Sequence, residues 1–336
     1  MNAPNGVLAE AGQTCNVSGT YATSANNQIL GQATGLGALI TGPGEEGTIS
    51  FTTSGSFSNA LQADTGGAIT LTPTADNPGT VTTTGNNSIG LYATGSASGE
   101  GGTVASSITV QNLNITTQGN FANGVQADTG GVVTLNGGSV AVTGTGSLGL
   151  FATGTGSQIN ATDVTVSTAG SGLSTANAID ADSGAVVTVT GGSASTTGTD
   201  AFVAGSTSGG TLNLSGTTIT ATGAGSGGLY ANGTGSTVTG TGLTITTHGN
   251  YDSENNFGAA GINNQSYGER RRRRDLDEFV DPHDGDAGDG RLHRERRNHE
   301  ADGRLDHDFG REFQWRPIGC GRDDDADQFD DHDGWR

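Results

Sequence analysis

The chain has 336 residues, 60 of which are glycine, and its formal net charge is −20. Every one of its 14 lysine or arginine residues is an arginine at or after Arg270, so residues 1–268 contain neither type. A region without these cations is poorly suited to following a phosphate backbone, which excludes nucleic-acid binding by residues 1–268. No run of about 20 apolar residues occurs, so we expect no membrane-spanning helix.

The charge and composition divide the chain into two zones. Of the 34 acidic residues, 13 precede position 269, which gives residues 1–268 a charge of −13 and leaves 14 − 21 = −7 for the rest. The first zone is rich in Gly, Thr, Ser and Ala, and the second is rich in Arg, Asp and His. Each zone holds one cysteine, Cys15 or Cys320, so the sequence predicts no disulfide framework.

Residues 1–13 make the first predicted segment. Leu8-Ala-Glu-Ala11 has small residues spaced as in a signal-peptide cleavage site, although no charged and apolar stretch comes before it. We therefore predict that residues 1–13 are an N-terminal remnant that includes the end of a signal peptide, with its earlier part encoded upstream of Met1.

An internal repeat dominates residues 14–268. Three segments align without gaps, starting at Asn59, Asn123 and Asn177, and the second reads Asn123-Gly-Val-Gln-Ala-Asp-Thr-Gly-Gly131. A second version, such as Gly90-Leu-Tyr-Ala-Thr-Gly95, alternates with them. The predicted apolar anchors of successive copies are Leu61, Leu91, Val125, Leu150, Ile179, Phe202, Leu229 and, in a weaker copy, Ile262. Their steps vary from 23 to 34 residues, which indicates a constant core with loops of variable length.

Each repeat contains three short strands separated by turns. Apolar and hydroxyl residues alternate in Thr80-Val-Thr82, Thr218-Ile-Thr220 and Thr244-Ile-Thr246, which is the period of a strand with one buried face. Glycine and asparagine at the corners permit positive φ angles. No segment shows an apolar stripe of helical period. The sequence therefore predicts an all-β fold, a three-faced parallel β-solenoid over residues 14–268, stabilised by stacking of neighbouring coils.

Three aspartates, Asp64, Asp128 and Asp182, occupy one position of the repeat and have two interpretations. A row of carboxylates along one edge could bind Ca²⁺ or act as acid and base on a polysaccharide. Each aspartate also precedes Thr-Gly or Ser-Gly, where the carboxylate commonly accepts a backbone N–H of its own turn. We favour the turn role.

No other residue in the body stands out chemically. His248 lies alone in a predicted turn, and no cation assists it as a base. The aromatic residues Tyr92, Phe151 and Tyr230 recur beside the anchors, where we expect them on one face or stacked on each other. We therefore predict no catalytic residue, no cofactor-binding residue and no metal ligand. Binding to a partner is expected at the longer loops, Ser96 to Gly102 and Gly249 to Asn256.

The tail, residues 269–336, is predicted to be disordered and to arise from a displaced reading frame. Codons for Asp, His and Asn have the form NAY, so a shift by one base turns them into codons for Thr, Ile or Met. With plausible codons for the other residues, the shifted tail reads as further Gly/Thr-rich repeat. A genuine disordered tail of mixed charge is the alternative.

The repeat units at residues 123–131 and 90–95, in a chain rich in Gly, Thr and Asn, resemble the pertactin-like passenger domains of Gram-negative autotransporters. The resemblance covers about Thr14 to Gly268. It implies a right-handed parallel β-helix that is exported through the periplasm and displayed at the cell surface by a C-terminal outer-membrane barrel, often in adhesion. The sequence departs from the family because no strands of barrel type follow Gly268, so we expect the chain to be a fragment that lacks the translocator.

Function follows from this resemblance and from the bland chemistry of the body. We expect a non-catalytic passenger at the cell surface that acts as an adhesin or a structural stalk, with a host or neighbouring-cell glycan or protein as partner. An enzyme of the β-helix type that acts on polysaccharides is the alternative. The outward Thr-x-Thr pairs make a Thr-rich ice-binding solenoid a minor alternative.

Overall fold

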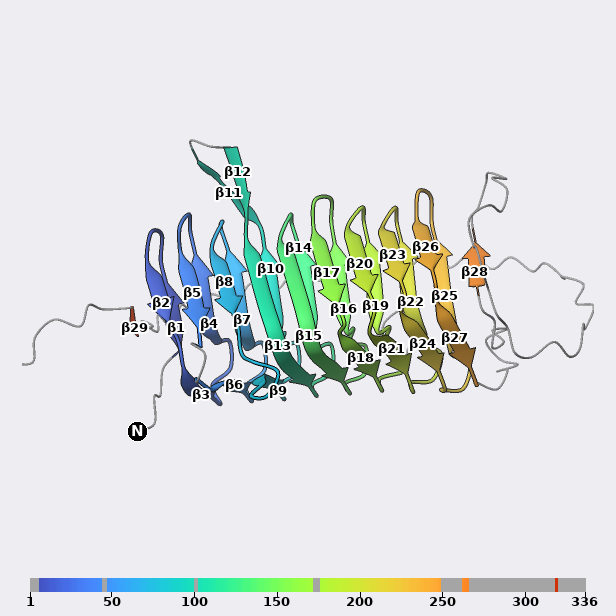
Figure 1. Ribbon diagram of the computed structural model, residues 1–336, viewed down its shortest axis with the longest axis horizontal. Helices are drawn as coiled ribbons and strands as arrows, with labels where there is room; N and C mark the ends of the chain where they lie inside the picture. Colours follow the sequence, from blue (N-terminus) through green and yellow to red (C-terminus); the bar gives the residue numbers. More distant parts are fainter. Residues whose placement is uncertain are drawn as a thin grey trace, which may run out of the picture.

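The computed structural model describes residues 6–43, 47–99, 102–171 and 176–248, together with the backbone of two short strands, Ile262–Gln265 and Ile318–Gly319. Within these residues the chain is all-β, without helix, and forms a parallel β-solenoid of about nine turns (Figure 1). The predicted fold class is therefore confirmed. Consistent with the sequence, no helix in the described ranges is long and apolar enough to cross a membrane.

The first face of the solenoid, called sheet A, takes one strand from every coil. From the N-terminal end its strands are β1 (Val7–Ala9), β4 (Ile29–Thr34), β7 (Asn59–Asp64), β10 (Leu91–Thr94), β14 (Val125–Asp128), β16 (Leu150–Thr153), β19 (Ile179–Asp182), β22 (Phe202–Thr207), β25 (Gly227–Asn232) and β28 (Ile262–Gln265). A further strand, β29 (Ile318–Gly319), pairs with β1 at the N-terminal end of the sheet. All these pairings are parallel, as the repeat predicts.

The other two faces belong to one bent sheet, called sheet B. Its first face consists of β2 (Thr14–Asn16), β5 (Leu39–Gly42), β8 (Ala68–Leu71), the first parts of β13 (Ser107–Thr117) and β15 (Val132–Val142), β17 (Gln158–Thr162), β20 (Val186–Thr190), β23 (Thr211–Ser215) and β26 (Thr237–Thr241). Its second face consists of β3 (Gly19–Thr23), β6 (Ile49–Thr53), β9 (Gly79–Thr83), the last parts of β13 and β15, β18 (Thr165–Thr168), β21 (Ser193–Thr196), β24 (Thr218–Ala221) and β27 (Thr244–Thr247).

Strand register stacks equivalent side chains into rows, which fill the narrow core. In sheet A one inward row contains Leu61, Leu91, Val125, Leu150 and Ile179, all fully buried. The inward row two residues later is almost entirely alanine, from Ala9 and Ala33 to Ala152 and Ala181. Larger residues from sheet B, such as Ile108 and Val133, belong to the same buried cluster as these alanines. Each coil thus depends on its neighbours for burial of its apolar edge.

The corner that leads into sheet A, called the sheet A corner, shows how the chain bends in every coil. One residue there has positive φ, and the equivalent residues of successive described coils are Asn27, Phe57, Asn87, Phe121, Gly146, Asp200 and Gly225. Buried serines bridge neighbouring coils beside it. For example, the Ser88 hydroxyl accepts the Ser58 N–H at 3.0 Å and donates to the Gly55 carbonyl at 3.0 Å. The predicted use of asparagine and glycine holds, but phenylalanine and aspartate also occur at this corner.

The solenoid starts earlier than the repeat predicted. Strand β1 pairs with β4, with Val7 opposite Gly31 and Ala9 opposite Ala33, so residues assigned to an N-terminal remnant form the first coil. The small-x-small pattern at Leu8 to Ala11 is therefore also a copy of the repeat. The repeat alignment missed this copy and the one after it. The anchor of the later copy is a glycine, Gly31, because a Cβ there would lie 2.6 Å from Leu61 Cδ2.

One predicted anchor was wrong. In β22 the residue that continues the row of Ile179 and Leu229 is Ala204, and not Phe202. Phe202 lies two residues earlier and packs against Tyr230, with ring centroids 4.5 Å apart. The corrected steps on either side of Ala204 are both 25 residues. The weaker anchor Ile262 is confirmed by its register opposite Leu229.

The predicted insertion after β10 forms an antiparallel hairpin, β11 (Ser96–Gly99) and β12 (Gly102–Ala105), which projects from the stack (Figure 1). The second predicted loop, Gly249 to Asn256, lies outside the described residues, as does nearly all of the tail. Although no disulfide framework was predicted, Cys15 in β2 is disulfide-bonded, and Cys320 lies outside the described residues.

Candidate functional site

The three repeat aspartates lie on the outward surface of sheet A, in a row in which they alternate with threonine. Register places Thr34, Asp64, Thr94, Asp128, Thr153, Asp182 and Thr207 in successive coils. The aspartates are therefore two coils apart, about 10 Å at the strand spacing of roughly 4.8 Å. The carboxylate row weighed from the sequence exists, but a hydroxyl residue separates each pair of its members.

The favoured turn role of these carboxylates is wrong. The turn after each strand is closed by the backbone carbonyl, as in the 2.9 Å bond from the Gly67 N–H to the carbonyl oxygen of Asp64. The carboxylates instead accept hydrogen bonds from neighbouring coils: Thr34 donates to Asp64 Oδ1, and Thr94 donates to Asp128 Oδ1. From their own turns they accept side-chain hydroxyls and not backbone N–H groups: Thr65 donates to Asp64 Oδ1 at 3.2 Å, and Ser183 donates to Asp182 Oδ2 at 2.9 Å.

Next to the aspartate row runs a second outward row that contains Tyr92, Phe151, Asp180 and Tyr230. The aromatic residues share this face as expected, but they do not stack on each other. The Tyr92 hydroxyl donates to Asp128 Oδ2 at 2.6 Å. Burial, together with this hydrogen bond, raises the pKa of Tyr92 to about 12.

Asp180 departs from the pattern of the earlier copies. In these, an asparagine donates to a glutamine three residues later: Asn59 to Gln62 at 3.0 Å and Asn123 to Gln126 at 2.9 Å. Gln62 in turn donates to Asp64 at 3.0 Å. In the third copy the glutamine is replaced by Asp180, whose carboxyl lies beside Asp182 and has no amide hydrogen to donate.

Asp180 is held from one side by a network that reaches two coils along the stack. Asn177 donates to its Oδ2 at 2.7 Å, and the Tyr230 hydroxyl donates to the same oxygen at 3.1 Å. Tyr230 reaches this far because Gly205, on the intervening coil, has no side chain; a Cβ there would lie 1.9 Å from Tyr230 Cε1. The other oxygen, Oδ1, has no hydrogen-bond partner, and Asp180 is 3% exposed.

The two neighbouring carboxyls titrate differently. Burial raises the pKa of Asp180 to about 7, and the hydrogen bonds from Asn177 and Tyr230 offset only part of this effect. Partial burial acts in the same direction on Asp182, but hydrogen bonds led by that from Thr207, 2.7 Å from Oδ1, outweigh it and lower the pKa of Asp182. Near pH 7 the site therefore contains one acid close to its midpoint and one fully ionised carboxylate.

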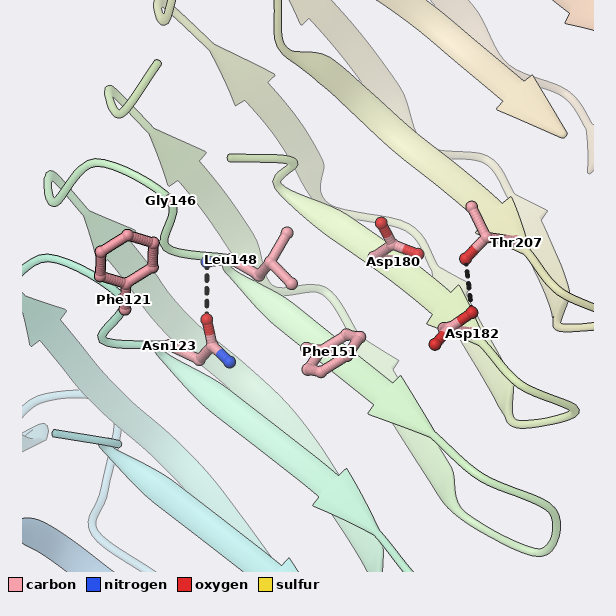
Figure 2. A pocket seen from close by; sticks show the side chains of 8 residues that line it. All are labelled: Phe121, Asn123, Gly146, Leu148, Phe151, Asp180, Asp182 and Thr207. Atoms are coloured by element: carbon pink, nitrogen blue, oxygen red, sulfur yellow. Dashed lines mark hydrogen bonds between the residues drawn. The ribbon is translucent and has the colours of Figure 1, made fainter. Parts of the chain in front are cut away.

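A hollow of about 420 Å³ opens on sheet A beside this pair. Figure 2 shows its lining, in which side chains from four consecutive coils share one face, with Phe151 on the strand next to Asp180 and Asp182. The lining residues are Phe121, Asn123, Gly146, Leu148, Phe151, Asp180, Asp182 and Thr207. Three apolar side chains form one part and the two carboxyls the other, which is a typical composition for a small-molecule site.

Phe121 forms the outer edge of the hollow in an unusual conformation. It has a φ of 54° and is 64% exposed. Its ring lies over Gly146 of the next coil, where an added Cβ would lie 2.6 Å from Phe121 Cε1. The left-handed region costs a non-glycine residue about 1–2 kcal/mol, and a mostly exposed ring returns little of this by burial.

Other predicted features lie apart from the hollow. His248 is exposed at the end of the last described coil. Threonines line the second face of sheet B, but their rows are interrupted by Asn114, Ala141 and several serines. In the described ranges no three His, Cys, Asp or Glu residues are placed to hold a metal ion.

The sequence did not identify the hollow. The replacement of Gln62 and Gln126 by Asp180 was visible in the aligned copies and was the one available signal. Comparison with known proteins adds nothing to this geometry, because no family model, no curated protein and no solved structure matches the chain.

Proposed function

We propose that the chain is a non-catalytic passenger of an autotransporter, displayed at the cell surface, that acts as an adhesin or structural stalk. One observation carries this proposal: about nine coils stack without interruption in the described ranges. At roughly 4.8 Å per coil they make a rod about 40 Å long. Such a rod holds a binding surface away from the membrane that anchors it.

The chemistry of the repeat supports the same proposal. The carboxylates of Asp64 and Asp128 are bonded to hydroxyl groups of neighbouring coils, so they contribute to the stack. Residues 1–268 carry no lysine or arginine, and their charge of −13 favours solubility outside a cell. Adhesion then uses the side chains on the outside of the rod.

Surface display and adhesion are tested separately on the full chain. Mild protease treatment of intact producing cells is expected to remove it, and the purified protein is expected to bind to host or neighbouring cells with saturation. A chain protected in intact cells contradicts display, and binding no stronger than that of an unrelated acidic protein contradicts adhesion.

A second function, hydrolysis of a polysaccharide, is favoured by the acid pair. Asp180 and Asp182 lie two residues apart in one strand, about 7 Å between Cα atoms at 3.3–3.4 Å per residue. Burial raises the pKa of Asp180 whereas hydrogen bonds lower that of Asp182, as in pairs that combine a general acid with an ionised partner. Release of reducing ends from a polysaccharide panel, lost in both Asp180→Asn and Asp182→Asn, would select this function over the first.

A further inference from the structure

Phe121, at the aromatic edge of the hollow, is one of two exposed phenylalanines at the sheet A corner. The other is Phe57, and the remaining described coils have asparagine, glycine or aspartate there, which adopt positive φ readily. Phe121 takes the same conformation and leaves its ring mostly exposed over Gly146. Of the two phenylalanines, Phe121 lines the hollow and Phe57 does not.

The apolar part of the hollow continues from Phe121 onto sheet A. Leu148 and Phe151, both on the next coil, line it together with the ring of Phe121. In the outward row that contains Phe151, the preceding and following coils have Gln126 and Asp180, so the phenylalanine has no aromatic partner there. The two rings therefore line the hollow from adjacent coils and from different positions along the strand direction (Figure 2).

The polar part of the hollow presents acceptors. Asp180 lines the hollow, but it is 97% buried and its unpaired Oδ1 has almost no accessible surface. Asp182, two residues along the same strand, is only partly buried and also lines the hollow. Its two oxygens accept hydrogen bonds from Thr207 and Ser183, and each has a further lone pair that can accept a ligand hydroxyl.

The charge of the residues around the hollow limits the chemical class of ligand that it can bind. No lysine or arginine occurs in residues 1–268, so nothing in the described part of the chain attracts an anion, and two carboxyls repel it. Ring faces bind the C–H face of a pyranose by burial of apolar surface, while carboxyl oxygens accept its hydroxyl hydrogens. Aromatic faces also attract ammonium groups, so a cationic sugar is the competing ligand in the test.

We propose that this hollow is a binding site for a neutral saccharide, with sugar rings packed on Phe121 and Phe151 and a hydroxyl donated to Asp182. The inference deepens the proposed adhesive function, since it names the chemical class that the rod recognises. The site spans four coils, about 14 Å along the axis, which suits a short segment of a glycan chain.

The test uses the full-length protein and four defined probes. Chitohexaose, cellohexaose and maltohexaose are neutral, and the hexamer of chitosan has the backbone of chitohexaose with free amines. Binding of each is measured by calorimetry at neutral pH. Phe121→Asn removes the ring but keeps the turn, because Asn87 occupies the same corner one coil earlier. Phe57→Asn is the matched control: Phe57 has the same conformation and is 60% exposed, but it does not line the hollow.

At least one neutral hexasaccharide is expected to bind. Phe121→Asn and Phe151→Ala should each weaken this binding about tenfold or more, as is usual for a central aromatic contact, while Phe57→Asn leaves it unchanged. Circular dichroism verifies that the variants are folded. Equal loss in Phe121→Asn and Phe57→Asn, or binding of the chitosan hexamer alone, would overturn the proposal.

Failure of the site and failure of the adhesive function give different results. If no neutral probe binds but the full chain still adheres to cells, the saccharide site is wrong and adhesion stands. If a probe binds at the hollow but the chain does not adhere to cells, the site stands and the adhesive function is wrong.

Discussion

Replacement of Asp180 by asparagine should stabilise the protein in a pH-dependent way. Burial raises the pKa of Asp180 to about 7 in the folded chain, against 3.8 for the unperturbed group. An acid with a raised pKa binds its proton more tightly in the folded state, so stability is highest at low pH and falls as the pH rises from about 4 to about 7. Asparagine cannot ionise and removes this loss.

The magnitude follows from the difference between the two pKa values. About 3 pKa units at roughly 1.36 kcal/mol each correspond to about 4 kcal/mol. The gain of Asp180→Asn over wild type should therefore be about 4 kcal/mol larger at pH 8 than at pH 4. Any constant effect of the new amide on Asn177 and Tyr230 cancels in this difference.

Urea unfolding followed by circular dichroism at the two pH values measures the effect. Asp182→Asn is the matched control on the same strand, and its sign is opposite: hydrogen bonds lower the pKa of Asp182, so its carboxylate stabilises the fold at neutral pH and loses this effect as the pH falls. If the difference between wild type and Asp180→Asn is the same at both pH values, the desolvated acid described here does not exist.

Three further predictions concern the stack itself. Gly205→Ala should destabilise the protein by about 1–3 kcal/mol, because its Cβ would overlap the ring of Tyr230; urea unfolding measures this, and an unchanged midpoint would contradict the packing. Tyr92→Phe should cost about 1–3 kcal/mol, since it removes a hydrogen bond to the Asp128 carboxylate, and Asp128→Asn should make the same substitution less harmful. Leu150→Ala should cost about 2–5 kcal/mol in the same assay, because the fully buried side chain leaves a cavity, and a loss below about 1 kcal/mol would refute its place in the core.

The periodic part of the fold was predictable from the sequence because each coil repeats the same local pattern. Leu91 and Val125 could be identified as anchors since alternation and spacing both indicate them. Gly31 could not be identified as an anchor, because Leu61 from the next coil fills the space that an anchor side chain would occupy. Phe202 was misplaced because its size suggested the core, whereas the room for its ring is outside, over Gly227.

The candidate site was less predictable than the fold because it depends on contacts between coils. Asp180 and Tyr230 are 50 residues apart, and their hydrogen bond needs a glycine on the coil between them. The sequence gives no sign that Phe121 and Phe151 line one hollow until the register is known. The exchange of glutamine for aspartate at position 180 is the one feature of this site that the aligned repeats show directly.

The alternation of aspartate and threonine on sheet A restricts how the rod can change in length. Loss of the single coil that carries Thr94 would bring Asp64 and Asp128 onto adjacent strands, about 5 Å apart, where two carboxylates repel by roughly 3 kcal/mol at an effective dielectric constant of about 20. Loss or duplication of two coils keeps the order. A pair of coils is therefore the smallest unit that can be gained or lost without placing two aspartates on adjacent strands. We expect longer or shorter versions of this rod to differ by even numbers of turns.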